Sequence, residues 1–216
     1  RRVLFRSVTI GSSDWIQNGG TFTGSNAAIT INGEFTVNGG SFTSTTSTFT
    51  SNTTFSGTVF KVATGATFTH NSGLINFTGS NHFNIYTAGN ALNNVSINKG
   101  GTSNSSGDMA VDGNLEILAA GTTNIATVLK GDLTGNNTNF AGGTLGQIKF
   151  TGTGSQSITY PGKLPSLIID KASGTISFES DFTATRDLIK LNGTVDPKTS
   201  TITLTTNHAT ITPSGM

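Results

Sequence analysis

Large apolar side chains return every six or seven residues through the first part of the chain, and this spacing constrains the fold more than any other feature. The series comprises Phe22, Ile29, Phe35, Phe42, Phe49 and Phe55. Thr or Ser stands beside each of them, so apolar and hydroxyl side chains alternate. Alternation with a period of two is typical of a half-buried β-strand. We therefore expect short strands with their aromatic residues inward, and no helix.

A step of six or seven favours a coil over a meander of hairpins, which normally repeats every 8 to 12 residues. In a β-solenoid each short strand ends in a bend, and after about three bends the chain lies roughly 4.8 Å above its previous turn. Three steps give about 20 residues per coil. The length of the chain then predicts about nine to ten coils and a height of roughly 45 Å. The expected fold is all-β, a right-handed parallel β-helix forming one elongated domain.

Asparagine and glycine pairs mark the expected corners of this coil. Asn18-Gly19-Gly20, Asn32-Gly33 and Asn38-Gly39-Gly40 contain residues that tolerate the left-handed backbone of a sharp bend. The same pairs suit hairpin turns, so an antiparallel sandwich stays open as an alternative.

A longer repeat of about 73 residues is also visible. The stretch INFTGSNHFNIYTAGNALNNVSINKGG, from residue 75, aligns with IKFTGTGSQSITYPGKLPSLIIDKASG, from residue 148. The matched pairs are Phe77 with Phe150, Leu92 with Leu164, Ile97 with Ile169, Lys99 with Lys171, and Gly121-Thr122 with Gly193-Thr194. Self-similarity at a fixed offset indicates one module stacked on another, with repeats at about 75–147 and 148–216.

This pattern resembles repeats of large secreted surface proteins of bacteria, which are often predicted to form parallel β-helices of the adhesin-like or autotransporter-like kind. The resemblance covers about residues 75–205. It implies secretion and display at the cell surface, and it carries no functional residue with it.

The charge balance argues against polyanionic partners. Charged residues are 11% of the chain and the net charge is +1, which leaves no basic field for nucleic acid or an anionic membrane. No apolar run approaches a membrane span, and the chain contains no Cys for disulfides or thiolate chemistry. Glycans, of a host or the environment, and other surface proteins are the partner classes left open.

The two ends differ from the rest of the sequence. Residues 1–7, RRVLFRS, carry three of the four Arg and match one translated frame of a common sequencing adapter, so we set them apart as an artefact or a leader. The ending ITPSGM follows a strand-like segment without a cap, which indicates a fragment cut within a repeat. The solenoid is expected over residues 8–216.

Residues for acid-base chemistry are scarce in the first half, where Asp14, Glu34 and Lys61 are the only Asp, Glu, Lys or Arg residues between residues 7 and 98. The second half contains more carboxylates. Among them, Glu179 and Asp181 lie two residues apart on one expected strand face, a spacing that is compatible with a Ca²⁺ site or an acid-base pair. On a repetitive surface such acids favour a solvated edge. The carboxylates concerned are Asp108, Asp112, Glu116, Asp132, Asp170, Glu179, Asp181, Asp187 and Asp196.

Histidine and aromatic residues give no stronger signal. His70, His82 and His208 lack metal-type spacing and predict surface positions. Trp15, Tyr86 and Tyr160 are isolated in sequence, and the two Tyr occupy similar places in the long repeat, which favours packing over sugar stacking.

Thr-x-Thr triplets at 21–23, 48–50 and 67–69 suggest the hydroxyl ranks of an ice-binding face. Their unequal intervals favour simple strand propensity instead.

These observations predict a structural stalk, display or adhesin-like module of a secreted bacterial surface protein. We expect no catalysis, and no catalytic, cofactor-binding or metal-binding residue. A carbohydrate-binding or carbohydrate-active β-helix is the first alternative, and an ice-binding Thr face is the second.

Overall fold

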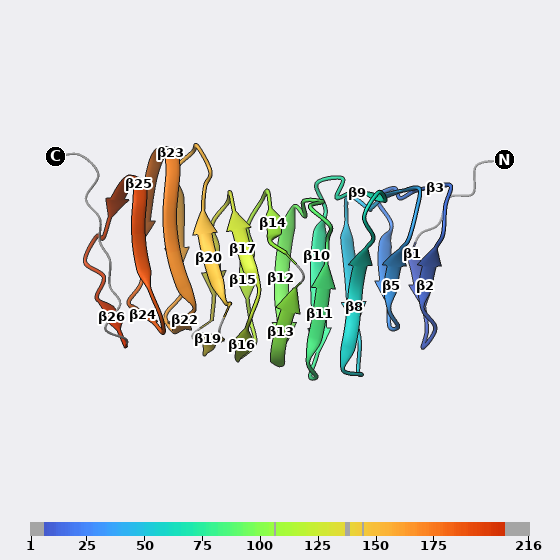
Figure 1. Ribbon diagram of the computed structural model, residues 1–216, viewed down its shortest axis with the longest axis horizontal. Helices are drawn as coiled ribbons and strands as arrows, with labels where there is room; N and C mark the ends of the chain where they lie inside the picture. The colour runs from blue at the N-terminus through green and yellow to red at the C-terminus, as the bar shows by residue number, and fades with distance from the viewer. Residues whose placement is uncertain (1–6, 106, 137–138, 144, 206–216) are drawn as a thin grey trace.

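The computed structural model describes residues 7–105, 107–136, 139–143 and 145–205. The described chain is a β-solenoid of about ten turns, with strands and no helix. Figure 1 shows the turns side by side along the long axis, with the first strands at one end and the last at the other. This confirms the predicted all-β solenoid and its predicted number of coils. The right-handed sense of the coil stays a prediction.

Three faces run along the solenoid, and each receives about one strand from every turn. The first face contains β1 (Ser7–Ile10), β4 (Ala28–Ile31), β7 (Thr48–Asn52), β10 (Leu74–Gly79), β12 (Asn94–Lys99), β15 (Leu115–Ile117), β18 (Leu133–Gly135) and β21 (Gln156–Thr159). The long strands β23 (Ser166–Phe178) and β25 (Leu188–Asp196) turn a corner, so their second halves complete this face and their first halves belong to the third.

The second face contains β2 (Trp15–Gln17), β5 (Phe35–Val37), β8 (Gly57–Val62), β11 (Phe83–Tyr86), β13 (Gly101–Ser105), β16 (Gly121–Thr123) and β19 (Phe140–Gly142), followed by β22 (Lys163–Leu164), β24 (Phe182–Ala184) and β26 (Ile202–Leu204). The third contains β3 (Thr21–Thr23), β6 (Ser41–Thr43), β9 (Thr67–Thr69), β14 (Met109–Val111), β17 (Ala126–Leu129) and β20 (Gln147–Phe150), with Leu92 bridging to Val111.

Every pairing between described strands is parallel, so the antiparallel sandwich is wrong for this part of the chain. The commonest separation between partners is 20 positions, as between Thr21 and Ser41. The coils are not equal, however. Met109 pairs with Thr127 after 18 positions, whereas Phe42 pairs with Phe68 after 26. Insertions at the corners take up these differences, and the ladder of the first face stays continuous.

Aromatic residues fill the core of the N-terminal coils, as predicted. Phe42 is 1% exposed and stacks between Phe22 and Phe68, at ring centroid distances of 4.6 and 5.7 Å. Parallel stacking follows directly from the register, which places these three residues one above another. Phe35 and Phe49 are fully buried beside them.

The prediction for Phe55 is wrong. Its side chain is 39% exposed, and Phe60 and Val59 fill the core of that turn instead. This turn is one of the longer ones, and Phe55 falls in the corner between β7 and β8, where the extra residues lie. The six-residue step therefore breaks here because the insertion delays the next inward position.

Glycines form corners where another side chain does not fit. Gly20 and Gly40 have φ of 71° and 78°, in the left-handed region. A Cβ on Gly40 would also lie 2.1 Å from the carbonyl oxygen of Gly20, in the turn below. Gly20 and Gly40 confirm the predicted Asn-Gly-Gly corners, and Gly40 serves both the bend and the close stacking of turns.

Residues matched in the long repeat are buried alike but lie on different faces, Phe77 in β10 of the first face and Phe150 in β20 of the third. Phe77 and Phe150 are both buried on strands of the parallel ladders, and Lys99 and Lys171 are both 1% exposed. The solenoid was predicted from residue 8, and Ser7, the last residue of the segment set apart, is the first residue of β1. Residues 1–6 of the separate leader and residues 206–216 at the C-terminus lie outside the described residues.

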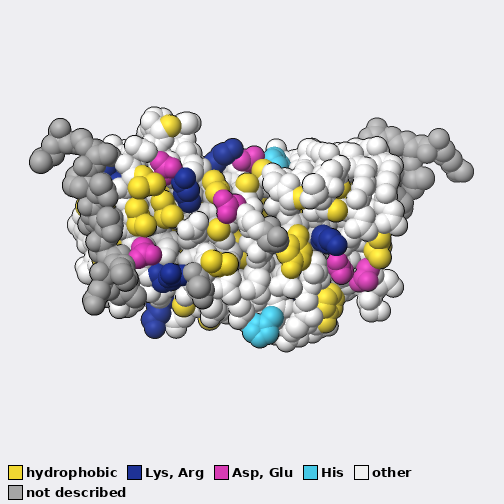
Figure 2. All heavy atoms as spheres, viewed as in Figure 1, with side chains coloured by type: hydrophobic (Ala, Val, Ile, Leu, Met, Phe, Trp, Pro, Cys, Tyr) yellow, Lys and Arg dark blue, Asp and Glu magenta, His cyan; other side chains and the backbone are white. Residues whose placement is uncertain are grey.

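The outer surface is mostly neutral. Figure 2 shows one face on which backbone and uncharged polar or glycine residues, drawn in white, predominate and charged side chains are dispersed. In the part of the chain that the structure describes, no helix has the length and apolar character of a membrane span.

Candidate functional site: a polar groove across one corner

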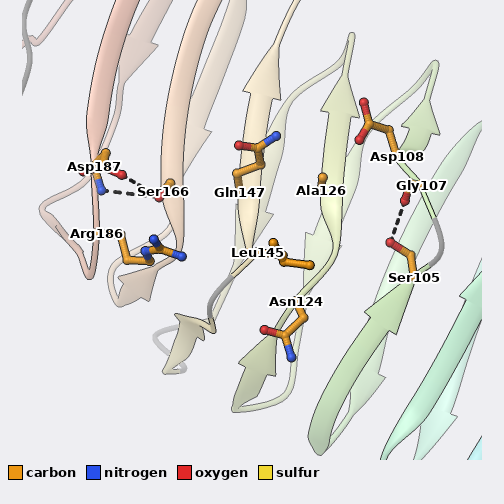
Figure 3. Close-up of a pocket in the computed structure, with 11 residues that line it drawn as sticks. Ser105, Gly107, Asp108, Asn124, Ala126, Leu145, Gln147, Ser166, Arg186 and Asp187 are labelled. Atoms are coloured by element: carbon orange, nitrogen blue, oxygen red, sulfur yellow. Dashed lines mark hydrogen bonds between the residues drawn. The ribbon is translucent and has the colours of Figure 1, made fainter.

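A groove of about 370 Å³ crosses the corner between the second and third faces. Five successive turns contribute to it, from the segment after β13 to the start of β25. Figure 3 shows its side chains arranged across neighbouring strands of the solenoid. The lining residues are Ser105, Gly107, Asp108, Asn124, Ala126, Leu145, Gly146, Gln147, Ser166, Arg186 and Asp187.

The floor of the groove is a single column of the ladder. Ala126 pairs with Gln147, and Gln147 pairs with Ser166. Asp108 and Asp187 extend this column at its two ends. Met109, which follows Asp108, pairs with Thr127, so Asp108 lies beside Ala126. Leu188, which follows Asp187, pairs with Leu167, so Asp187 lies beside Ser166. One side chain per turn therefore lines the groove at a spacing of about 4.8 Å.

A column of asparagines ends at the wall of the groove. The amide of Asn104 donates to Asn84 Oδ1 at 3.2 Å, and the amide of Asn124 donates to Asn104 Oδ1 at 3.0 Å. In the next turn Gly143 follows, and a Cβ there would lie 2.0 Å from Asn124 Oδ1. The column stops because Gly143 has no side chain to continue it.

Arg186 and Asp187 close the far end. Arg186 Nη1 donates to the carbonyl oxygen of Gly143 at 2.8 Å, across two turns. Asp187 Oδ2 lies 3.5 Å from the hydroxyl of Ser166, which also accepts from the Asp187 amide at 3.4 Å. The guanidinium is thus fixed by the backbone beneath it.

Asp108 differs from the other carboxylates expected from the sequence. Among the described residues its side chain has no hydrogen-bond or ion-pair partner, whereas the other eight acids of the second half each have one. These contacts are Asp112 with Lys130 at 2.7 Å, Glu116 with Ser96 at 3.0 Å, Asp132 with the Ser157 amide at 2.7 Å, Asp170 with Lys149 at 2.7 Å, Glu179 with Lys198 at 3.7 Å, Asp181 with the Thr201 amide at 2.6 Å, Asp187 with Ser166 at 3.5 Å, and Asp196 with the Lys198 amide at 3.0 Å.

The Glu179 and Asp181 pair does not share a strand face. Both residues lie in the corner between β23 and β24, so the expected alternation does not apply to them. Glu179 pairs with Lys198, and Asp181 caps a backbone amide of the next turn. In the described residues no group of three or more His, Cys, Asp or Glu side chains is arranged to hold a metal ion.

Two histidines act as caps of corner backbone. His82 Nδ1 accepts from the Thr102 amide at 2.8 Å, and His70 Nδ1 accepts from the Ser72 amide at 2.9 Å. His70 Nε2 also lies 3.8 Å from Asp112. His208 lies outside the described residues.

The isolated aromatics pack in different ways. Trp15 makes edge contacts with Phe22 and Phe42, at centroid distances of 4.9 and 5.6 Å. Tyr160 is fully buried, which confirms its packing role, and Tyr86 is half-buried at the end of β11.

The Thr triplets fall on two faces. Residues 21–23 and 67–69 lie in β3 and β9 of the third face, with Ser41–Thr43 between them, and residues 48–50 lie in β7 of the first. The register pairs Thr23 with Thr43 and Thr43 with Thr69. Unequal sequence intervals thus hide an aligned array of three strands.

Lys99 and Lys171 are the polar residues that sequence reasoning missed. Lys99 Nζ donates to Thr53 O at 2.8 Å and Oγ1 at 3.0 Å. Lys171 Nζ donates to the carbonyl oxygens of Gly152 and Gly154, both at 2.8 Å, and to Gln156 Oε1. Burial lowers the pKa of both ammonium groups, and for Lys171 the charge of Asp132 opposes that shift. The sequence signal that could have predicted a structural role for these two lysines is their matched position in the long repeat.

Comparison with known proteins adds no relative: no family model, curated protein or solved structure matches the chain.

Proposed function

We propose that this chain is a structural stalk or display module of a secreted bacterial surface protein, with no catalytic centre of its own. The observation that carries the proposal is the continuous parallel ladder through about ten turns. Main-chain hydrogen bonds and a continuous apolar core link each turn to the next, so the fold extends along one axis. A rod of about ten turns spans roughly 45 Å.

The polar groups support a mechanical role. Most acids of the second half bind a backbone amide or a cation in a neighbouring turn, as Asp132 binds Ser157 and Asp170 binds Lys149. The two buried lysines bind carbonyl oxygens of earlier turns in the same manner. These side chains therefore stabilise turn against turn.

Pulling the chain by its two ends tests the stalk. A solenoid that bears load should unravel turn by turn, and a coil of about 20 residues should release a contour length of about 65 Å, at about 3.3 Å per residue. Repeated small steps would support the proposal, whereas one release of the whole contour length at low force would contradict it.

Display is tested on cells. With the chain inserted between a surface anchor and an epitope tag, the tag should become more accessible to antibody than with the anchor alone. A flexible Gly/Ser linker of equal residue number is the control. Equal accessibility for the solenoid and the anchor alone would contradict a display role.

The aligned hydroxyl array favours ice binding as a second candidate. Thr21, Thr23, Thr67 and Thr69 are exposed, and no charged residue stands in β3, β6 or β9. Ice recrystallisation assays of the chain and of Thr43→Lys test this candidate, with Thr50→Lys on the first face as control. Activity lost only in Thr43→Lys would support it, and no activity in the unmodified chain would exclude it.

A further inference from the structure

We propose that the corner groove binds a neutral linear oligosaccharide along the solenoid axis. This binding activity goes beyond the stalk and does not depend on it. It would give a display module a partner at its own surface, in a groove of about 370 Å³.

Two polar side chains in the groove have no protein partner. Among the described residues, neither the carboxylate of Asp108 nor the carboxamide of Gln147 makes a hydrogen bond, although both line the groove and Gln147 is half-buried. Most acids of the second half, by contrast, contact a neighbouring turn, as Asp132 and Asp170 do. A half-buried amide with unused donor and acceptor capacity is suited to a polar ligand.

The charges in the groove select against ionic ligands. Two carboxylates, Asp108 and Asp187, lie at opposite ends of the floor, about four turn spacings or roughly 19 Å apart. They would repel a polyanion, and Arg186, bound to the Gly143 carbonyl, is the one cation of the lining. The carboxylates are also too far apart to chelate one metal ion together. A neutral ligand with many hydroxyl groups fits this balance.

The spacing of the floor favours a linear chain of sugars. One side chain per turn faces the groove, at a spacing of about 4.8 Å, so an extended chain of sugar rings would meet a new side chain at about every ring. Carboxylates and carboxamides match the donors and acceptors of neighbouring sugar hydroxyls. Leu145, which is 68% exposed, provides an apolar surface for the C–H face of a ring.

Ala126 and Gly146 leave the groove open. Ala126 stands in the column between Asp108 and Gln147, where a larger side chain would fill the floor. This position provides a variant that blocks the groove without removing a polar group.

The experiment titrates the whole chain with neutral pentasaccharides, namely cellopentaose, mannopentaose and N-acetylchitopentaose, and with pentagalacturonate as the anionic comparison. Calorimetry measures affinity, and amide NMR shifts locate the site. We expect at least one neutral probe to bind, with Gln147→Ala weakening it at least tenfold and Ala126→Phe abolishing it. Asn18→Ala, an exposed asparagine at a distant corner, should bind as the unmodified chain does.

Circular dichroism and melting temperature establish that each variant is folded. Three results would overturn the proposal: no shift with any neutral probe, equal binding by Gln147→Ala, or preference for pentagalacturonate. None of them would affect the stalk, which rests on the force and display measurements.

Discussion

Alanine at three corner glycines separates the contributions of the bend and of the stacking. Gly19 has space around it and no left-handed backbone, Gly65 has φ of 85° with nothing within 4 Å, and Gly40 combines φ of 78° with a Cβ position 2.1 Å from the Gly20 carbonyl oxygen. Gly19 is therefore under neither constraint, Gly65 is under the backbone constraint alone, and Gly40 is under both the backbone and the packing constraint.

The expected free energies of unfolding follow from these geometries. Gly19→Ala should stabilise the protein by about 0.5 kcal/mol, because alanine restricts the unfolded chain. Gly65→Ala should destabilise it by about 1 kcal/mol, since the left-handed region costs an L-residue about 1–2 kcal/mol and that entropy term offsets part of it. Gly40→Ala should lose about 3 kcal/mol or more, because overpacking adds about 1–3 kcal/mol.

Urea unfolding followed by two probes measures the series. Far-UV circular dichroism reports all turns, and the fluorescence of Trp15 reports the first turns, because this residue packs on Phe22 and Phe42. Stability in a solenoid is a sum of local terms. Gly40→Ala should therefore shift the fluorescence transition more than the dichroism. Equal losses for Gly40→Ala and Gly65→Ala would refute the close stacking of turns.

Three further predictions concern the core and the charged groups. Phe42→Ala should cost about 3–5 kcal/mol in urea unfolding and Phe55→Ala under about 1 kcal/mol, because only Phe42 is buried; similar losses would contradict the assigned core. Burial lowers the pKa of Lys99 and Lys171 below the ordinary value of 10.5. Between the folded-state pKa values and 10.5 the unfolded chain therefore binds more protons than the folded chain, and the free energy of unfolding should rise with pH. Urea midpoints should show this rise in the unmodified chain and not in the variant with methionine at both positions. Hydrogen bonds from Lys149 and Asn192 lower the pKa of Asp170, so the stabilisation by its carboxylate is present above pH 3.8 and should be lost as pH falls through the folded-state pKa. Asp170→Asn should therefore reduce the fall of the urea midpoint between about pH 5 and 3. An unchanged fall would count against this contact.

The repeating apolar step was sufficient to predict the solenoid, because it records which side chains face inward. Thr21–Thr23 and Ser41–Thr43 lie one coil apart, as the predicted repeat of about 20 residues requires. Phe55 was misplaced because a corner insertion lengthens its turn. Local alternation carries no information about such an insertion, which becomes visible only when strands are paired.

The groove was beyond sequence reasoning for a related reason. Its floor joins Asp108, Ala126 and Gln147 from successive turns of unequal length, so no constant interval connects them. Glu179 and Asp181 drew attention by their spacing, yet they lie in a corner with separate partners. The burial of Lys99 and Lys171 could have been predicted from the sequence, because the two lysines occupy the same place in the long repeat of a chain with few charges.

Small-angle X-ray scattering of the whole chain tests most directly whether the turns stack along one axis. A stack of about ten turns predicts an elongated particle with a length of roughly 45 Å or more along the stacking axis. A compact, near-spherical particle of the same mass would contradict the solenoid, and with it both the stalk and the groove formed by its register.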